Sequence, residues 1–333
     1  MRSSAGDMAA WPETTRERDT PPSINGGWAV AALAVWIVLL IVALRWLKRA
    51  AQARFIRHKL LRTRPLAGDR RVIAAFSTLP DRIWNLQPTI ECLLHQTRVP
   101  DEIIVALPRF SRRQQRRYVV PEYLAEMPRV RLLECDTDWG PATKFIPVIQ
   151  SELEAGHDDS LIMIVDDDRI YPNDALETYL CYHRELPDAA LCFRGAPMPN
   201  DFVWRHARMV RGAGIREPRR VAVITGCGSY FIQPRFFDAE LWNYSESPPG
   251  AFYMDDIWIS GCLDRRGVKK YAIPTSAMMR TARQQRGTMT LHDIPEGRQY
   301  HNDEAIAFFG KTWDVFGPSY RGIARLCCFE PPA

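Results

Sequence analysis

Three consecutive carboxylates follow an apolar run in the middle of the chain. Asp166, Asp167 and Asp168 come directly after Leu161-Ile-Met-Ile-Val165, which predicts a strand buried on both faces. Adjacent carboxylates at the end of such a strand repel one another and raise one another's pKa. A divalent cation removes this repulsion, and Mg²⁺ or Mn²⁺ prefers hard oxygen ligands that it can share with substrate phosphates. The run therefore predicts a metal site beside a nucleotide diphosphate.

Within this site the roles of the three carboxylates should differ. In an extended turn Asp166 and Asp168 point to the same side, so we predict them as the metal ligands. Asp167 would then face the nucleotide ribose or solvent. The alternative is a solvated acidic turn that caps the following helix, although a cap needs only one carboxylate.

A second acidic pair, Asp255 and Asp256, precedes the apolar pattern Ile257-Trp-Ile and is expected to open a helix. Carboxylates are stabilised at a helix N-terminus, whose positive end also lowers their pKa. One of the two could act as a general base that takes a proton from a hydroxyl group. Helix capping alone is the alternative.

Two glycines, Gly226 and Gly228, lie in Thr225-Gly-Cys-Gly-Ser-Tyr230, just after an expected strand at 221–224. Glycines allow a ligand to approach the backbone closely, although a turn at a sheet edge explains them equally well. The segment does not have the spacing of a phosphate-binding loop, because it contains neither G-x-G-x-x-G nor Gly-Lys-Ser/Thr.

Two basic side chains could join these groups. Lys144 lies in the first turns of a helix expected at 141–153, where a cation opposes the helix dipole, so it either contacts an anion or is an ordinary surface lysine. His301 precedes a capped helix that is expected to run to about Trp313. It could complete the metal shell begun by the aspartates or be purely structural.

Residues 71–333 alternate apolar runs with helix-like stretches, without repeats or low-complexity tracts, and predict one α/β domain with a mostly parallel sheet covered on both faces. Ligands of such sheets bind beyond the carboxyl ends of the strands, where the acidic run lies. The expected strands are 72–76, 102–107, 130–133, 161–165 and 221–224, and the expected helices are 85–96, 141–153, 172–186 and one from Asp255.

The N-terminal part has a different pattern. A polar tail (1–27) precedes an apolar stretch (28–47) of nearly the length that a hydrocarbon layer requires, with tryptophans near both ends, so we predict one transmembrane helix. A buried core helix and a signal peptide are the alternatives. The segment 48–70 is strongly basic. Its charge places the C-terminal side in the cytoplasm, and it either lies on anionic lipid or forms a solvated linker helix.

The composition excludes a disordered chain, a collagen-like chain and a polytopic membrane protein. Apolar residues make up 46% and charged residues 25% of the chain, as in globular proteins, and the net charge is +5. The 8 cysteines are scattered, which favours free thiols in a reducing compartment. Nucleic acid is an unfavoured partner, because arginines concentrate next to the apolar stretch and at 109–117 with few interleaved aromatic residues.

Together these motifs resemble a GT-A fold glycosyltransferase, close to the family 2 type. The matching pieces are Ser77-Thr-Leu-Pro80, the Asp166–Asp168 run as a DxD site, the Thr225–Tyr230 segment and Asp255-Asp256-Ile-Trp, in the family's order. Trp139-Gly-Pro-Ala-Thr-Lys144 also resembles exostosin-like transferases. The resemblance implies a UDP- or GDP-sugar donor, Mn²⁺ or Mg²⁺, and transfer to a hydroxyl of a glycan or lipid-linked acceptor.

The resemblance also implies roles for single residues. Asp256, with Asp255 as second choice, would be the catalytic base, and Asp166, Asp168 and His301 would hold the metal. The acceptor would meet Gly226, Cys227, Gly228 and Trp258. The donor would meet Ser77, Thr78, Leu79, Pro80, Arg82, Lys144, Asp166 and Asp167.

One departure from the pattern narrows the expected reaction. Processive polysaccharide synthases carry Q-x-x-R-W, whereas Arg283-Gln-Gln-Arg286 has no following tryptophan, so a single transfer is favoured over polymer synthesis. A sugar-phosphate nucleotidylyltransferase is an alternative, but it would need a glycine-rich basic loop after the first strand. A non-catalytic, membrane-anchored binding protein is another, although both acidic sites are intact.

Overall fold

The computed structural model describes residues 26–62, 70–282 and 298–318 of the chain. Most of the polar tail and the whole Arg283–Arg286 run lie outside these residues. The chain divides into two compact units, one up to Leu47 and one from Lys48 onward. Each unit is described by itself.

The first unit contains most of helix α1 (Gly26–Arg62). At 1.5 Å per residue its 37 residues come to about 55 Å, more than the roughly 30 Å of a hydrocarbon layer. An 18-residue window of the helix has a mean hydropathy of 2.5 and is 0% buried. Its large apolar side chains are exposed; Trp36 and Leu39, for example, have exposed fractions of 71% and 55%. The helix is thus long and apolar enough to cross a membrane.

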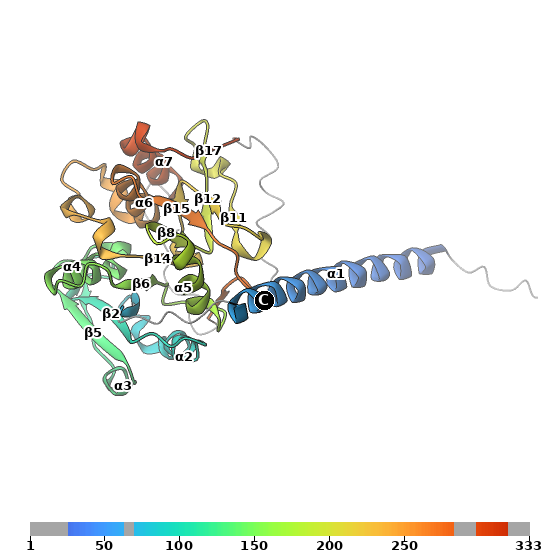
Figure 1. Ribbon diagram of the computed structural model, residues 1–333, viewed down its shortest axis with the longest axis horizontal. Coiled ribbons are helices and arrows are strands. Elements are labelled where there is room, and N and C mark those ends of the chain that lie inside the picture. Colours follow the sequence, from blue (N-terminus) through green and yellow to red (C-terminus); the bar gives the residue numbers. More distant parts are fainter. Residues whose placement is uncertain (1–25, 63–69, 283–297, 319–333) are drawn as a thin grey trace, which may run out of the picture. The chain divides into compact units, whose positions relative to one another are not determined.

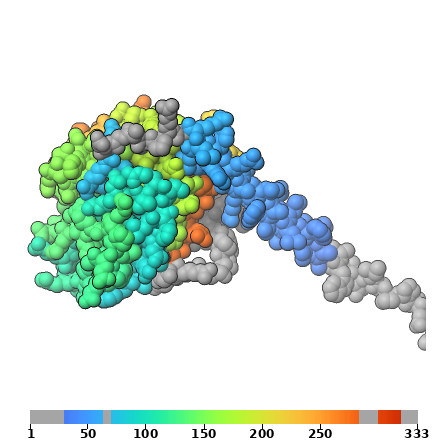
Figure 2. Space-filling model, turned by 60° about the horizontal axis from the view of Figure 1, so that its bottom comes forward, coloured from blue at the N-terminus to red at the C-terminus, as the bar shows by residue number. Residues whose placement is uncertain are grey.

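The last turns of α1, from Lys48, belong to the second unit and pack on it. Ile56 is buried, and the Gln52 side-chain amide donates hydrogen bonds to the carbonyl groups of Gly212, Ile215 and Thr275 at 3.1–3.3 Å. Figure 2 shows this end of the helix, in blue, lying against the rest of the unit. The sequence predicts a solvated linker helix or a lipid-bound segment at 48–70. The packing of Gln52 and Ile56 instead extends the larger unit back to Lys48.

An eight-stranded sheet forms the centre of the larger unit, in the order β12-β15-β8-β14-β6-β1-β2-β5 (Figure 1). Only β14 and the edge strand β12 oppose the direction of the others, which confirms the predicted mostly parallel α/β sheet. The strands are β1 (Val72–Ser77), β2 (Glu102–Pro108), β5 (Val130–Cys135), β6 (Leu161–Ile164), β8 (Ala189–Cys192), β12 (Arg219–Arg220), β14 (Tyr230–Ile232) and β15 (Lys269–Ala272).

The sheet separates two hydrophobic cores, because neighbouring residues of each strand point to opposite faces. In β1, Ile73 and Ala75 join one core, whereas Ala74 and Phe76 join the other. The first core contains residues of α4 (Ile146–Glu154), α6 (Asp255–Arg265) and α7 (Arg298–Phe309). The second contains residues of α2 (Gln87–Leu94), α5 (Ala175–Glu185) and the short α3 (Glu122–Glu126).

Several elements begin or end differently from the sequence prediction. The helix expected at 141–153 is broken at Phe145 into a 3-10 turn, η2 (Gly140–Lys144), and α4, so Lys144 ends a turn and does not open the helix. Of the expected strand 221–224, only Val223–Ile224 forms a strand, β13, which pairs with β9 (Arg194–Ala196) in a small separate sheet. The helix after His301 already begins at Arg298.

The topology brings distant loops to one edge of the sheet. β1 and β6 are parallel neighbours with Ala75 opposite Ile164, so the segments that follow them leave the sheet side by side. β14 runs the other way, with Tyr230 opposite Ile164, so the residues that precede it lie at the same edge. The loop after β1, the aspartate run and the glycine-rich turn therefore meet.

Candidate active site

The aspartate run follows β6 and alternates in exposure. The side chains of Asp166 and Asp168 are 26% and 25% exposed, whereas that of Asp167 is 7% exposed. The alternation is what an extended turn would produce. The enclosed Asp167 accepts a hydrogen bond from the Thr78 hydroxyl at 2.6 Å and pairs with Arg82 at 2.8 Å. Burial raises the pKa of Asp167 to about 6, although Arg82 and Thr78 oppose the increase.

Basic side chains of the protein itself neutralise the three carboxylates. Lys144 lies 2.9 Å from Asp166, Arg82 lies 3.1 Å from Asp168, and Arg169 lies 3.3 Å from Asp168. Burial acts to raise the pKa of Asp166, but Lys144, Arg169 and Arg82 together outweigh it, and the net pKa is lowered. Side chains of the protein thus offset part of the repulsion that the sequence analysis assigned to a metal ion, because the sequence pattern does not show which cations fold against the run.

The loop after β1 contacts the aspartate run through Thr78 and Arg82 and lines one side of a cavity. Leu79 begins a turn by accepting hydrogen bonds from the backbone N–H groups of Arg82 and Ile83, and Tyr118 donates to the Thr78 carbonyl at 2.7 Å. Ser77 ends β1 and is partly exposed. A cavity of about 260 Å³ lies beside the loop, lined by Pro80, Asp81, Trp84, Arg116, Arg117 and Val119.

The second acidic pair opens α6, as predicted. Asp255 is 5% exposed and pairs with Lys144 at 2.8 Å, while Asp256 accepts a hydrogen bond from the backbone N–H of Gly226 at 2.7 Å. Burial raises the pKa of Asp256 to about 7, and repulsion from Asp255 adds to this, whereas Lys144 opposes it. A carboxyl with such a pKa can exchange a proton near neutral pH.

Gly226 is the point at which these groups converge. A Cβ atom placed on it would lie 2.5 Å from Lys144 Nζ, 3.1 Å from Asp256 Oδ1 and 3.3 Å from Asp166 Oδ1. Residues that are far apart in the sequence thus surround one backbone position. The glycine is required here because no side chain fits between them.

Replacing Gly226 with Ala is expected to lower the free energy of unfolding of the larger unit by about 1–3 kcal/mol, because the added methyl group displaces Lys144 and both carboxylates from their positions. Urea unfolding of the full-length protein in detergent measures the effect. The matched control is Gly214→Ala, where an added Cβ meets no atom within 4 Å and the stability should change by less than about 0.5 kcal/mol. Equal stability of the two variants would contradict this geometry.

The rest of the glycine-rich turn is tightly held. Ser229 has a φ of +69°, a conformation that a residue with a side chain rarely adopts and that is often found at functional sites. Its carbonyl accepts a hydrogen bond from Tyr179 at 2.9 Å. Arg194 donates to Cys227 Sγ at 2.7 Å, and a Cβ atom on Gly228 would overlap the Arg194 side chain. Arg194 therefore positions the two predicted acceptor-binding residues Cys227 and Gly228.

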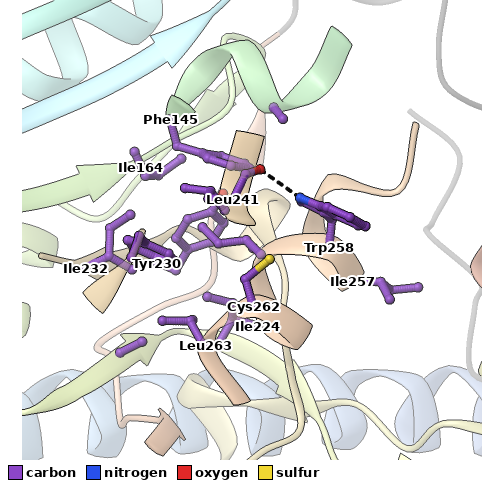
Figure 3. Packing of buried hydrophobic residues seen from close by; sticks show 14 of the residues in the cluster. Phe145, Ile164, Ile224, Tyr230, Ile232, Leu241, Ile257, Trp258, Cys262 and Leu263 are labelled. Carbon is purple, nitrogen blue, oxygen red and sulfur yellow. Dashed lines mark hydrogen bonds between the residues drawn. The ribbon is translucent and has the colours of Figure 1, made fainter. Parts of the chain in front are cut away.

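Trp258 is a core residue, which corrects its predicted place in the acceptor site. It is 1% exposed, and its indole N–H donates to the Leu241 carbonyl at 2.8 Å (Figure 3). The indole stacks on Tyr244 with ring centroids 4.3 Å apart. A side chain so enclosed packs the protein and has no surface left for an acceptor.

Among the contacts that the structure describes, the His301 ring lies beside Glu304 and Gly250, not beside the aspartate run. His301 lies on α7 with Nδ1 3.4 Å from Glu304 Oε2, and its ring fills the space that a side chain on Gly250 would occupy. In the described residues, no three His, Cys, Asp or Glu side chains are grouped closely enough to hold a metal ion. The oxygen atoms that fit a hard cation best are those of Asp166 and Asp168, because these side chains remain partly exposed.

Three residues of the site were not predicted. Arg169 pairs with Asp168, Arg194 holds Cys227, and Tyr230 is fully buried with its hydroxyl in the field of Lys144 and the carboxylates. Burial, the largest effect, raises the pKa of the Tyr230 hydroxyl well above its usual value. Arg169 could have been found from its place beside the acidic run. Arg194 and Tyr230 carried no such signal.

No family model matches the chain, and no curated protein is similar enough to it to count as a relative. What the protein does must therefore be inferred from the chemistry of the site.

Proposed function

We propose that the protein is a GT-A type glycosyltransferase that moves a sugar from a nucleotide-sugar donor to a hydroxyl group of a glycan or lipid-linked acceptor, in a single transfer. The observation that carries the proposal is the convergence of Asp166, Asp256 and Lys144 around Gly226. An acidic run suited to a diphosphate site thus lies beside a separate carboxyl that can take a proton.

Asp256 is the general base in this proposal. Its Oδ1 is oriented by the Gly226 N–H, and its pKa of about 7 suits removal of a proton from the acceptor hydroxyl. The acceptor oxygen forms a bond to the anomeric carbon of the sugar, the bond to the diphosphate oxygen breaks, and the acceptor proton passes to Asp256. Asp255 remains the second choice.

Asp166 and Asp168 would hold Mn²⁺ or Mg²⁺ through their partly exposed oxygens. Bound there, the ion would offset negative charge on the leaving diphosphate. Asp167 keeps the loop after β1 in place through Thr78 and Arg82. The cavity beside Pro80, with Trp84 and two arginines in its lining, has a chemistry that suits the nucleoside end of the donor.

Membrane attachment through the apolar part of α1 is also part of the proposal, with the larger unit on the cytoplasmic side. The basic residues that follow the apolar stretch support this orientation, as does the absence of a paired cysteine among the described ones.

Thermal unfolding of the full-length protein in detergent with UDP or GDP, with and without Mn²⁺, tests the donor site. We expect one nucleotide to raise the midpoint only in the presence of Mn²⁺, and Asp168→Ala to abolish the shift. Asp136→Ala is the control, because that side chain is 81% exposed. If neither nucleotide stabilises the wild-type protein, the transferase proposal is wrong. If a shift occurs but no sugar donor is turned over, the binding-protein alternative is favoured.

The pH dependence of kcat/KM is expected to have an acid limb near the pKa of Asp256, about 7. The base is active when deprotonated, so kcat/KM should rise as the pH increases through this value. In Asp255→Asn the repulsion that raises the Asp256 pKa is removed, so the limb should move to lower pH. A profile that is flat from about pH 5 to pH 8 would exclude Asp256 as the base.

A further inference from the structure

Lys144 occupies an unusual position for a lysine. It ends the η2 turn and is only 8% exposed. Its Nζ lies 2.9 Å from Asp166 Oδ1 and 2.8 Å from Asp255 Oδ2. One ammonium group therefore links the segment after β6 to the first turn of α6.

This link joins the two halves of the proposed reaction. Asp166 belongs to the diphosphate side, whereas Asp255 precedes the proposed base Asp256 on the acceptor side. Without the ammonium group, the carboxylates of Asp166 and Asp256 at Gly226 and that of Asp255 would lose the cation that lies between them, and their repulsion would act to separate the N-terminus of α6 from the end of β6. Burial acts to lower the pKa of Lys144, but Asp166 and Asp255 raise it well above its usual value, so the group stays charged.

The close fit at Gly226 limits where the ammonium group can go. Nζ lies 2.5 Å from the position of a Cβ atom on Gly226, so the lysine fills the space that a side chain would need. With a hydrogen bond to Asp166 and an ion pair to Asp255 already formed, little of the ammonium group remains for a ligand from solvent.

We propose that Lys144 is a positioning residue that ties Asp166 to Asp255 and so holds Asp256 against the Gly226 N–H, and that it does not bind the donor diphosphate. This inference rests on the proposed function for its catalytic consequence. It replaces the donor-contacting role expected from the sequence. The ion-pair bridge itself can be tested without any activity.

A double-mutant cycle on the full-length protein in detergent tests the bridge. Lys144→Met removes the cation paired with the buried Asp255 and is expected to lower the unfolding midpoint by roughly 10 °C. In Lys144→Met/Asp255→Asn the loss should be clearly smaller than the sum of the two single losses, because the second substitution removes part of the unpaired charge. The matched control combines Asp255→Asn with Lys269→Met, an exposed lysine, and its losses should add. Additive losses for the Lys144 pair would overturn the proposal.

A second measurement separates positioning from ligand binding. In Lys144→Met the Kd of UDP with Mn²⁺ should stay within about threefold of the wild-type value, while kcat falls by about 100-fold because the base is misplaced. A Kd weakened by about tenfold or more with kcat unchanged would show a direct diphosphate contact and overturn the proposal. If the wild-type protein neither binds UDP or GDP nor turns over a donor, the proposed function fails, and the unfolding cycle still decides the bridge.

Discussion

Replacing Asp256 with Asn is expected to lower kcat for sugar transfer by about 10³-fold. The amide oxygen of asparagine can still accept the hydrogen bond from the Gly226 N–H, so the local structure should persist. The amide cannot take a proton from the acceptor hydroxyl, so the loss should appear in the chemical step. The Kd of UDP with Mn²⁺ should be nearly unchanged. Transfer to an acceptor and binding of the nucleotide, measured on the same preparation, check both expectations.

Slow hydrolysis of the donor by water provides an internal control for this variant. Asp256→Ala should retain donor hydrolysis while transfer to the acceptor disappears, because the diphosphate side of the site is intact. Asp255→Asn tests the second choice, since Asp255 pairs with Lys144 and lies one residue before the proposed base. A greater loss of transfer in Asp255→Asn than in Asp256→Asn would assign the base to Asp255. Equal loss of hydrolysis and transfer in Asp256→Ala would remove the base role altogether.

Replacing Trp258 with Ala is expected to lower the free energy of unfolding of the larger unit by about 4 kcal/mol. The indole packs with ring centroids 4.3 Å from Tyr244, 5.7 Å from Phe308 and 5.3 Å from Phe309. Its removal leaves a large cavity and deprives the Leu241 carbonyl of its hydrogen bond (Figure 3). Urea unfolding of the full-length protein in detergent, followed by circular dichroism, measures the change.

Two further variants make this prediction specific to packing. Trp258→Phe retains an aromatic ring and should lose less stability than Trp258→Ala. Trp84→Ala removes an indole that is 55% exposed and should change the free energy of unfolding by less than about 1 kcal/mol. If Trp258→Ala is as stable as the wild-type protein but has a raised KM for the acceptor, Trp258 belongs to the acceptor site and its assignment to the core is wrong.

Four of the eight strands in the central sheet, and the loops that follow them, were predictable from local sequence patterns. The apolar runs at 72–76 and 161–165 are too apolar to lie at the surface and coincide with β1 and β6. The alternation along Asp166, Asp167 and Asp168 follows from the two-residue repeat of extended chain, and the structure encloses the middle one. The helix that begins at Asp255 was also predictable, because acidic residues precede a helical apolar pattern.

Contacts between distant segments were not predictable in this way. In the sequence, Lys144 resembles a poorly placed cation at the start of a helix. Its two carboxylate partners became apparent only in the tertiary structure, because even the nearer one, Asp166, is 22 residues away in the sequence. The Ile257-Trp258-Ile259 pattern could not show which face of α6 is enclosed. The packing of Lys48–Arg62 depends on carbonyl groups as far away in the sequence as Thr275.

By itself, the sequence determined the strands β1, β2, β5 and β6 and that the acidic groups lie at a strand end and at a helix start, because propensity and periodicity act over a few neighbouring residues. The sheet strands β8, β12, β14 and β15 were not predicted and became apparent only in the tertiary structure. Only the tertiary structure decided which cation neutralises which carboxylate, and that Gly226 is the position where they meet. Ion pairing and close packing depend on distances in space, and the strand order that sets these distances joins residues far apart in the chain.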